Sequence, residues 1–131
     1  MSEVAALEEV RRFFENYAQL FDEGRWAEFC ELFHSPALSV RGDGSVSLLG
    51  SKAEAALFFT GVAKAWKSEG YDHFTTTDMS ALCLGSRSRL VTFTWHMRSS
   101  SGEEIKAWRQ SYQLVKVRER WVVLSSTFHI E

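Results

Sequence analysis

Two tyrosines are the side chains best suited to hold a polar atom of a small molecule: Tyr17, early in the chain, and Tyr112, near its end. If both hydroxyls pointed into one cavity, they would form a pair of donors for a carbonyl or a developing oxyanion. Gln110 stands two residues before Tyr112, on the same face of any strand, and would add a third polar group. The alternative is that each tyrosine packs its ring in the core and bonds a backbone carbonyl. The sequence leaves both readings open.

Four histidines are candidates for a general acid or base, because the unperturbed pKa of imidazole lies near neutrality: His34, His73, His96 and His129. His73 follows Asp72, which could orient its ring. His129 alternates with Thr127 and Ser125, so it would join a polar wall if that face of the last strand points inward. Which face does so is open at this stage. A surface histidine or one satisfied in the core is the alternative for each.

Metal and cofactor chemistry is not expected. No two histidines have H-x-x-x-H or H-E-x-x-H spacing, and the two cysteines, Cys30 and Cys83, are far apart with no C-x-x-C pattern. Cys30 shares an apolar stripe with Trp26, Phe29 and Phe33, which is typical of a small buried residue.

Aromatic residues make up 14% of the chain, which indicates either a bulky core or an apolar cavity. Trp66, Trp95 and Trp108, with Phe58 and Phe93, could line a ligand chamber or fill it. Burial of each large ring contributes about 2 to 3 kcal/mol in either case, so composition does not separate the two.

Length and charge limit the class of protein further. A chain of 131 residues predicts one domain, residues 1–131, with a sizeable core. The net charge is -2, and acidic and basic residues are mixed along the chain without a basic stripe. We therefore expect no nucleic-acid partner. The N-terminal segment carries acidic residues where a signal peptide has a basic region, and no apolar run is long enough to span a membrane. We therefore expect a cytoplasmic protein without a membrane partner.

Apolar residues recur at helical spacing over 3–33 and 51–66. The stripe of the first helix is Leu7, Val10, Phe14, Tyr17 and Phe21. Gly24 predicts its C-cap, and a second helix should run from about Trp26 to Phe33. A capping box at 51–54 predicts the start of a third helix, whose apolar face would be Ala55, Phe58, Val62, Ala65 and Trp66.

Strand signals dominate the rest of the chain. A short hairpin is expected from 37–41 and 45–49, and turn signals divide the C-terminal half into strands over 72–84, 87–98, 103–117 and 121–130. Alternation over 90–97 places Val91, Phe93, Trp95 and Met97 on one face. Helices followed by long strands predict an α+β fold, in which three helices from the N-terminal half pack on a curved, mostly antiparallel sheet and leave a walled pocket.

The segment 13–37, FFENYAQLFDEGRWAEFCELFHSPA, resembles the opening of the NTF2-like superfamily, and Trp121-Val122-Val123 resembles the signal that begins that family's last strand. The chain looks similar to SnoaL-like and ketosteroid isomerase-like members, and closest to uncharacterised bacterial ones. This resemblance implies a cone whose strongly curved sheet wraps around the helices, a cavity at the open end, and a homodimer formed through the outer sheet face.

The isomerase branch permits a comparison by position. Tyr17, seven residues before Gly24, stands where those isomerases keep the tyrosine that donates to the substrate oxyanion. The position of their aspartate base falls at Arg41, and that of their protonated aspartate falls near Tyr112. A guanidinium does not abstract a proton at neutral pH. The resemblance therefore does not imply isomerisation by the family mechanism, unless the hairpin shifts Asp43 into the place of the base.

The sequence predicts an NTF2-like cone that binds a small, mainly apolar ligand. The predicted ligand-binding residues are Tyr17, Trp66, Trp95, Trp108, Gln110 and Tyr112. One alternative is a cofactor-free isomerase, lyase or cyclase, with Tyr17 as the oxyanion donor and His73 or His129 as the base. The other is a dimeric protein-interaction module, which would need an exposed apolar rim.

Overall fold

The computed structural model describes residues 3–129, which form three helices and six strands. The helices are α1 (Glu3–Asp22), α2 (Trp26–Cys30) and α3 (Lys52–Ser68). The strands are β1 (Phe33–Val40), β2 (Val46–Leu49), β3 (His73–Cys83), β4 (Ser88–Arg98), β5 (Glu104–Val117) and β6 (Arg120–His129). Ile130, the expected end of the last strand, lies outside the described residues.

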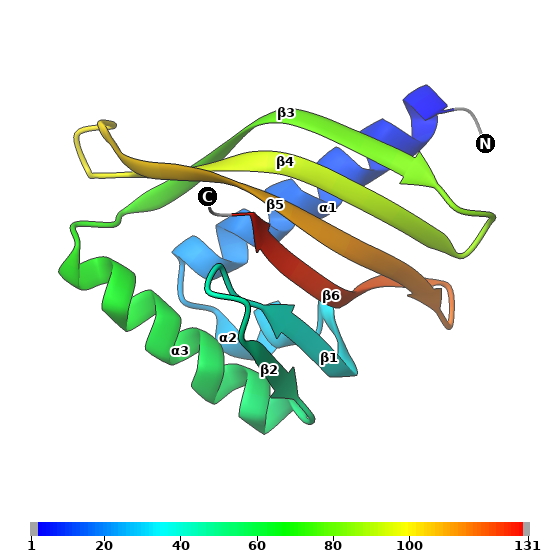
Figure 1. Cartoon of the computed structure of the whole chain (residues 1–131), viewed down its shortest axis with the longest axis horizontal. Coiled ribbons are helices and arrows are strands. Elements are labelled where there is room, and N and C mark those ends of the chain that lie inside the picture. The colour runs from blue at the N-terminus through cyan, green and yellow to red at the C-terminus, as the bar shows by residue number, and fades with distance from the viewer. Residues whose placement is uncertain (1–2, 130–131) are drawn as a thin grey trace.

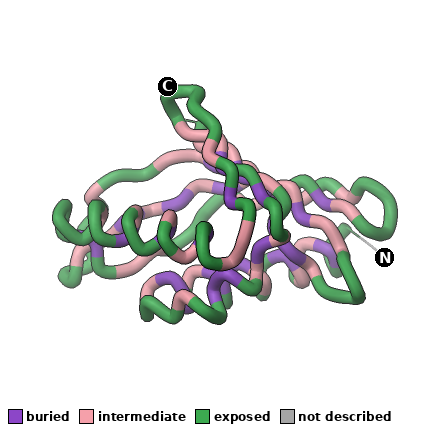
Figure 2. Tube along the Cα trace, turned by 90° about the horizontal axis from the view of Figure 1, so that it is seen from below, coloured by how far each residue is buried: buried purple, intermediate pink, exposed green. Residues whose placement is uncertain are grey.

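The six strands form one sheet in the order β2-β1-β6-β5-β4-β3. β1 and β6 pair in parallel, and every other neighbouring pair is antiparallel. Figure 1 shows the long strands β3, β4 and β5 bowed along their length. α1 contacts β3, α2 contacts both other helices, and α3 contacts β2. The expected α+β class, three helices on a curved and mostly antiparallel sheet, is confirmed. In Figure 2 the buried stretches lie in the interior, between the helices and the sheet.

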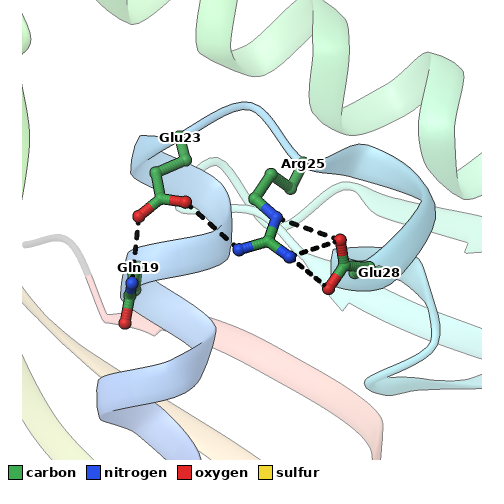
Figure 3. A network of polar contacts seen from close by, with 4 residues as sticks. All are labelled: Gln19, Glu23, Arg25 and Glu28. Atoms are coloured by element: carbon green, nitrogen blue, oxygen red, sulfur yellow. Dashed lines mark hydrogen bonds and ion pairs between the residues drawn. The ribbon is translucent and has the colours of Figure 1, made fainter.

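The turn between α1 and α2 closes as the sequence predicts. Gly24 has a φ of +68°, and its N–H donates to the Phe21 carbonyl while the Arg25 N–H donates to the Leu20 carbonyl. This bonding pattern is a Schellman motif, which needs the left-handed conformation that glycine adopts without strain. On the surface of the turn, Arg25 bridges Glu23 at 3.3 Å and Glu28 at 2.6 Å (Figure 3).

Helix α2 is shorter than its apolar spacing predicts. It ends at Cys30, and Phe33 already pairs with Val123 of β6 as part of β1. The Val123 N–H donates to the Leu32 carbonyl at 2.8 Å. Residues 31–33, which helical spacing assigns to α2, therefore lead into pairing with the last strand instead. A long-range backbone pairing thus overrides a local pattern that is compatible with helix.

Helix α3 begins at the expected cap, since the Ser51 hydroxyl accepts a bond from the Glu54 N–H at 3.1 Å. The Glu54 carboxylate accepts from the N–H of Gly50, one residue before the cap. The predicted apolar face is partly wrong. Ala55 is buried as expected, but Ala65 is exposed, and the other buried positions of the helix are Phe59 and Ala63.

The register of the sheet decides which side chains face the helices. Val91, Phe93, Trp95 and Met97 of β4 are all buried, which confirms the predicted alternation. Directly opposed residues of an antiparallel pair share a face. Trp95 therefore shares the inner face with its β5 partner Trp108, as Val91 does with Tyr112.

Strand β6 continues the inner face. Gln110 is opposed to Phe128, and Tyr112 is opposed to Ser126. Arg109 is opposed to His129, which therefore lies on the outer face together with Ser125 and Thr127. The sequence leaves open which face of the last strand points inward, and the register shows that it is the face of Phe128 and Ser126.

Candidate functional site

A chamber lies between the helices and the inner face of the sheet. Ten of the fifteen described residues that line it are aromatic. From the helices come Tyr17, Phe21, Phe58, Phe59 and Trp66. From the strands come Phe74, Trp95, Trp108, Tyr112 and Phe128.

The chamber is narrow. It leaves about 40 Å³ for the centres of water-sized molecules, and one water needs roughly 10 to 15 Å³ on that scale. Beyond its mouth lies a wider vestibule of about 420 Å³. Four residues line both spaces and mark the passage between them: Arg41, Trp66, Trp108 and Phe128.

A directed chain of hydrogen bonds reaches the chamber wall. The Trp95 indole N–H donates to the Tyr112 hydroxyl at 2.9 Å, and the Tyr112 hydroxyl donates to that of Tyr17 at 3.3 Å. An indole N–H only donates, so Tyr112 must accept from it and is left with its own proton to give to Tyr17. The proton of Tyr17 has no acceptor among residues 3–129. This series of hydrogen bonds therefore leaves the Tyr17 hydroxyl as a donor for a molecule in the chamber.

The amide of Gln110 supplies a second donor. The Trp108 indole N–H donates to Gln110 Oε1 at 2.8 Å. Because that contact requires an oxygen, it fixes the orientation of the amide and leaves Nε2 on the other side. Gln110 is only 4% exposed, and no described residue accepts a bond from its Nε2.

Both tyrosines of the chamber remain protonated. Burial raises the pKa of Tyr17, and it raises that of Tyr112 far above the usual value, because ionisation would place a charge in an apolar enclosure. Hydrogen bonding between the two hydroxyls lowers the pKa of Tyr17 slightly and raises that of Tyr112. Both hydroxyls are therefore neutral donors at any physiological pH.

The described wall of the chamber offers no general base. Among its described lining residues are no histidine, cysteine, lysine or carboxylate, and Arg41 is the one charged side chain. This arrangement can orient and polarise a carbonyl oxygen, but it offers no group to remove a proton from carbon at neutral pH.

All six predicted ligand-binding residues, Tyr17, Trp66, Trp95, Trp108, Gln110 and Tyr112, lie on the chamber wall. The two histidines considered as bases do not. His73 contacts Asp72 at 2.8 Å outside the chamber. His129 borders the vestibule, but its Nε2 lies 2.7 Å from Ser111 Oγ on the outer face of the sheet. The structure therefore does not bring either imidazole to the hydroxyl of Tyr17.

Several lining residues were not predicted, among them Ser39, Phe74 and Phe128. Phe128 could have been found from sequence only if the register of the last strand were known. Arg41, which aligns with the aspartate base of the isomerases, does line the cavity. Asp43, the carboxylate considered as a replacement base, does not line the chamber and accepts a bond from the Ser45 N–H in the turn.

A half-buried carboxyl lies just outside the chamber, and sequence reasoning missed it. Asp22, the last residue of α1, accepts hydrogen bonds from the Tyr71 hydroxyl and, at 3.4 Å, from the Phe74 N–H. Burial raises the pKa of Asp22 to about 6, although these bonds and His73 lower it and Asp72 raises it slightly. Asp22 borders a shallow depression beside Phe74 rather than the chamber itself.

Other kinds of site receive no support from the described part of the chain. Residues 3–129 contain no group of three or more histidine, cysteine or acidic side chains placed to hold a metal ion. Burial raises the pKa of the Cys30 thiol, which disfavours the reactive thiolate. None of the described helices combines the length and apolarity needed to cross a membrane.

The family described as NTF2-like protein (DUF6841) matches residues 8–130. The chain belongs to this family, and the resemblance predicted from its sequence is confirmed. No curated protein matches the chain.

Solved structures share the fold at low identity. Aln2 from a Streptomyces species has a TM-score of 0.78 at 14% identity, with 98% of this chain and 91% of that one covered. An NTF2-like protein with a cystatin-like fold from Novosphingobium aromaticivorans has a TM-score of 0.74 at 14% identity, over 92% and 79% of the two chains. An NTF2-like protein of unknown function from Shewanella oneidensis has a TM-score of 0.72 at 10% identity, over 92% and 96%. These similarities show a shared cone fold and nothing about activity.

Proposed function

We propose that this protein binds a small, mainly apolar molecule in the chamber, and that Tyr17 and Gln110 donate hydrogen bonds to an oxygen of that molecule. The observation that carries the proposal is the chain from Trp95 through Tyr112 to Tyr17, which ends in an unaccepted hydroxyl proton. A buried donor without an acceptor costs free energy, and a carbonyl or hydroxyl oxygen entering the chamber would remove that cost. The aromatic walls would contact the rest of the ligand.

Binding is better supported than turnover. Isomerase, lyase or cyclase chemistry of the kind considered above needs a base near the oxyanion donor, and the described chamber wall has none. The narrow chamber also favours a ligand body of one ring or a short chain over a fused ring system.

A titration with 3-phenylpropanamide, a single ring with a neutral carbonyl, tests the proposal. Trp66, Trp95 and Trp108 line the chamber, so binding should change tryptophan fluorescence and raise the melting temperature. Tyr17→Phe should weaken binding about fivefold to tenfold, since it removes one hydrogen bond and little volume. Tyr71→Phe is the matched control, because Tyr71 does not line the chamber. Unchanged affinity in Tyr17→Phe would show that the Tyr17 hydroxyl does not contact the ligand. If the wild type does not bind the probe, the chamber is part of the packed core and not a binding site.

The expected partner copy stays a prediction. The outer face of β3 and β4 carries Leu82 and Leu90, opposed to each other and 52% and 41% exposed. These side chains are the apolar surface that a homodimer through this face would cover.

A further inference from the structure

Arg41 lies at the passage between chamber and vestibule. It directly follows β1 and lines both spaces. The carbon at the centre of its guanidinium lies 5.1 Å from the centre of the Phe128 ring and 5.5 Å from that of Phe58. Contacts with the faces of aromatic rings hold a guanidinium in place and leave the N–H groups at its edge available.

No carboxylate of residues 3–129 pairs with this guanidinium. The nearest acid along the chain, Asp43, is engaged by the N–H of Ser45 at 2.9 Å, and Arg41 is only the last and weakest of the influences that lower its pKa. Half-buried arginines usually satisfy their five donors with carboxylates or carbonyls. Arg41 therefore stands at the mouth, and none of residues 3–129 accepts a hydrogen bond from its guanidinium.

The described surroundings of Arg41 do not offset its positive charge. No aspartate or glutamate is among the described residues that line the vestibule. The other cation there, Lys106, is already engaged by Glu69 at 3.0 Å. An anionic group entering the vestibule would thus meet a guanidinium that no described carboxylate pairs with, and no described acidic side chain would have to be displaced.

We propose that the ligand carries a carboxylate, which Arg41 binds at the mouth while the apolar body of the ligand lies in the chamber. This inference rests on the proposed function and specifies the chemical class of its ligand. The planar fork of arginine matches the two oxygens of a carboxylate, so the contact can be bidentate. The donors of Tyr17 and Gln110 lie further inside, on the chamber wall but outside the vestibule, and remain available for a second oxygen.

A matched pair of probes separates this inference from the proposed function. 3-(4-Acetylphenyl)propionate and 3-(4-acetylphenyl)propanamide carry the same ketone for the inner donors at one end, and at the other end they have nearly the same shape and differ in charge at pH 7.5. In calorimetric titrations of the wild type, the carboxylate should bind about tenfold or more tightly than the amide, because bonds to a charged group are the stronger ones. Arg41→Gln should abolish this preference, so that the two probes bind within about twofold of each other.

Arg12→Gln is the control variant, because Arg12 is exposed on α1 and outside both spaces. It makes the same change in net charge and should keep the preference. Should Arg41→Gln fail to fold, Arg41→Lys decides the question, since it keeps the charge but loses the fork and should reduce the preference by about threefold or more. Equal binding of both probes to the wild type, or a full preference in the Arg41 variants, would overturn the inference while leaving apolar binding intact. Binding of neither probe would overturn the proposed function together with it.

Discussion

The hydroxyl of Tyr112 donates a hydrogen bond of 3.3 Å to the hydroxyl of Tyr17, which lies 95 residues earlier in the chain. The two side chains come from β5 and α1, so this bond connects the sheet to the helix that covers it. Their rings also meet edge to face, with centres 5.6 Å apart. The pair therefore contributes both to the packing of the core and to the polar wall of the chamber.

Tyr112 should matter more to stability than Tyr17. Tyr112→Phe leaves the Trp95 indole N–H buried without an acceptor and also removes the bond to Tyr17, so we expect a loss of about 2 to 3 kcal/mol. Tyr17→Phe breaks only one bond and should cost about 1 kcal/mol. Urea denaturation followed by tryptophan fluorescence measures both changes. An equal loss for the two variants would contradict the position of Tyr112 between Trp95 and Tyr17 in the series of hydrogen bonds.

Asp22 should make the folded state less stable as the pH rises through the weakly acidic range. Its pKa is about 6 in the fold, against 3.8 for an unperturbed aspartate. Between these values the folded chain binds more protons than the unfolded one, so the free energy of unfolding falls with pH. The favourable contribution is complete below about 3.8 and is lost as the pH passes about 6.

Asp22→Asn keeps an oxygen that can accept from Tyr71 and cannot ionise. We expect this variant to be more stable than the wild type by about 1 to 2 kcal/mol at pH 7.5, a figure reduced for the partial exposure of Asp22, and to lose most of the dependence between pH 4 and 7. Urea denaturation at several pH values measures this, and Glu15→Gln, at an exposed position of the same helix, is the control. A wild-type stability that rises with pH over this range, with no gain in the asparagine variant, would show that Asp22 is not the group responsible.

The chain should sediment as a dimer of about twice its mass of 15.0 kDa. Leu90→Glu places a charge on the outer face of β4, opposite Leu82, and should shift the equilibrium toward the monomer. Leu57→Glu is the matched control, because Leu57 is 78% exposed on α3. Analytical ultracentrifugation distinguishes the outcomes, and a monomeric wild type at high concentration would end the dimer prediction.

Local pattern was enough to predict most elements of this fold. The apolar spacing of Val10, Phe14, Tyr17 and Phe21 marked the buried side of α1, and the alternation around Phe93 marked the inner face of β4. The N-cap at Ser51 and the left-handed conformation of Gly24 could also be predicted, because each depends on residues within a few positions. The same local reasoning failed at 31–33, where pairing with Val123 ends α2 early.

The site depended on information that is not local. The sequence by itself determined the residue types, including the two tyrosines, the tryptophans and the arginine at position 41. Only the tertiary structure decided that the rings leave a narrow chamber, that β6 turns Phe128 inward and His129 outward, and that Arg41 has no acidic partner among the described residues. The physical reason is that periodicity reports which side of an element is apolar, whereas the neighbour that covers that side is chosen by strand register and by packing between distant segments.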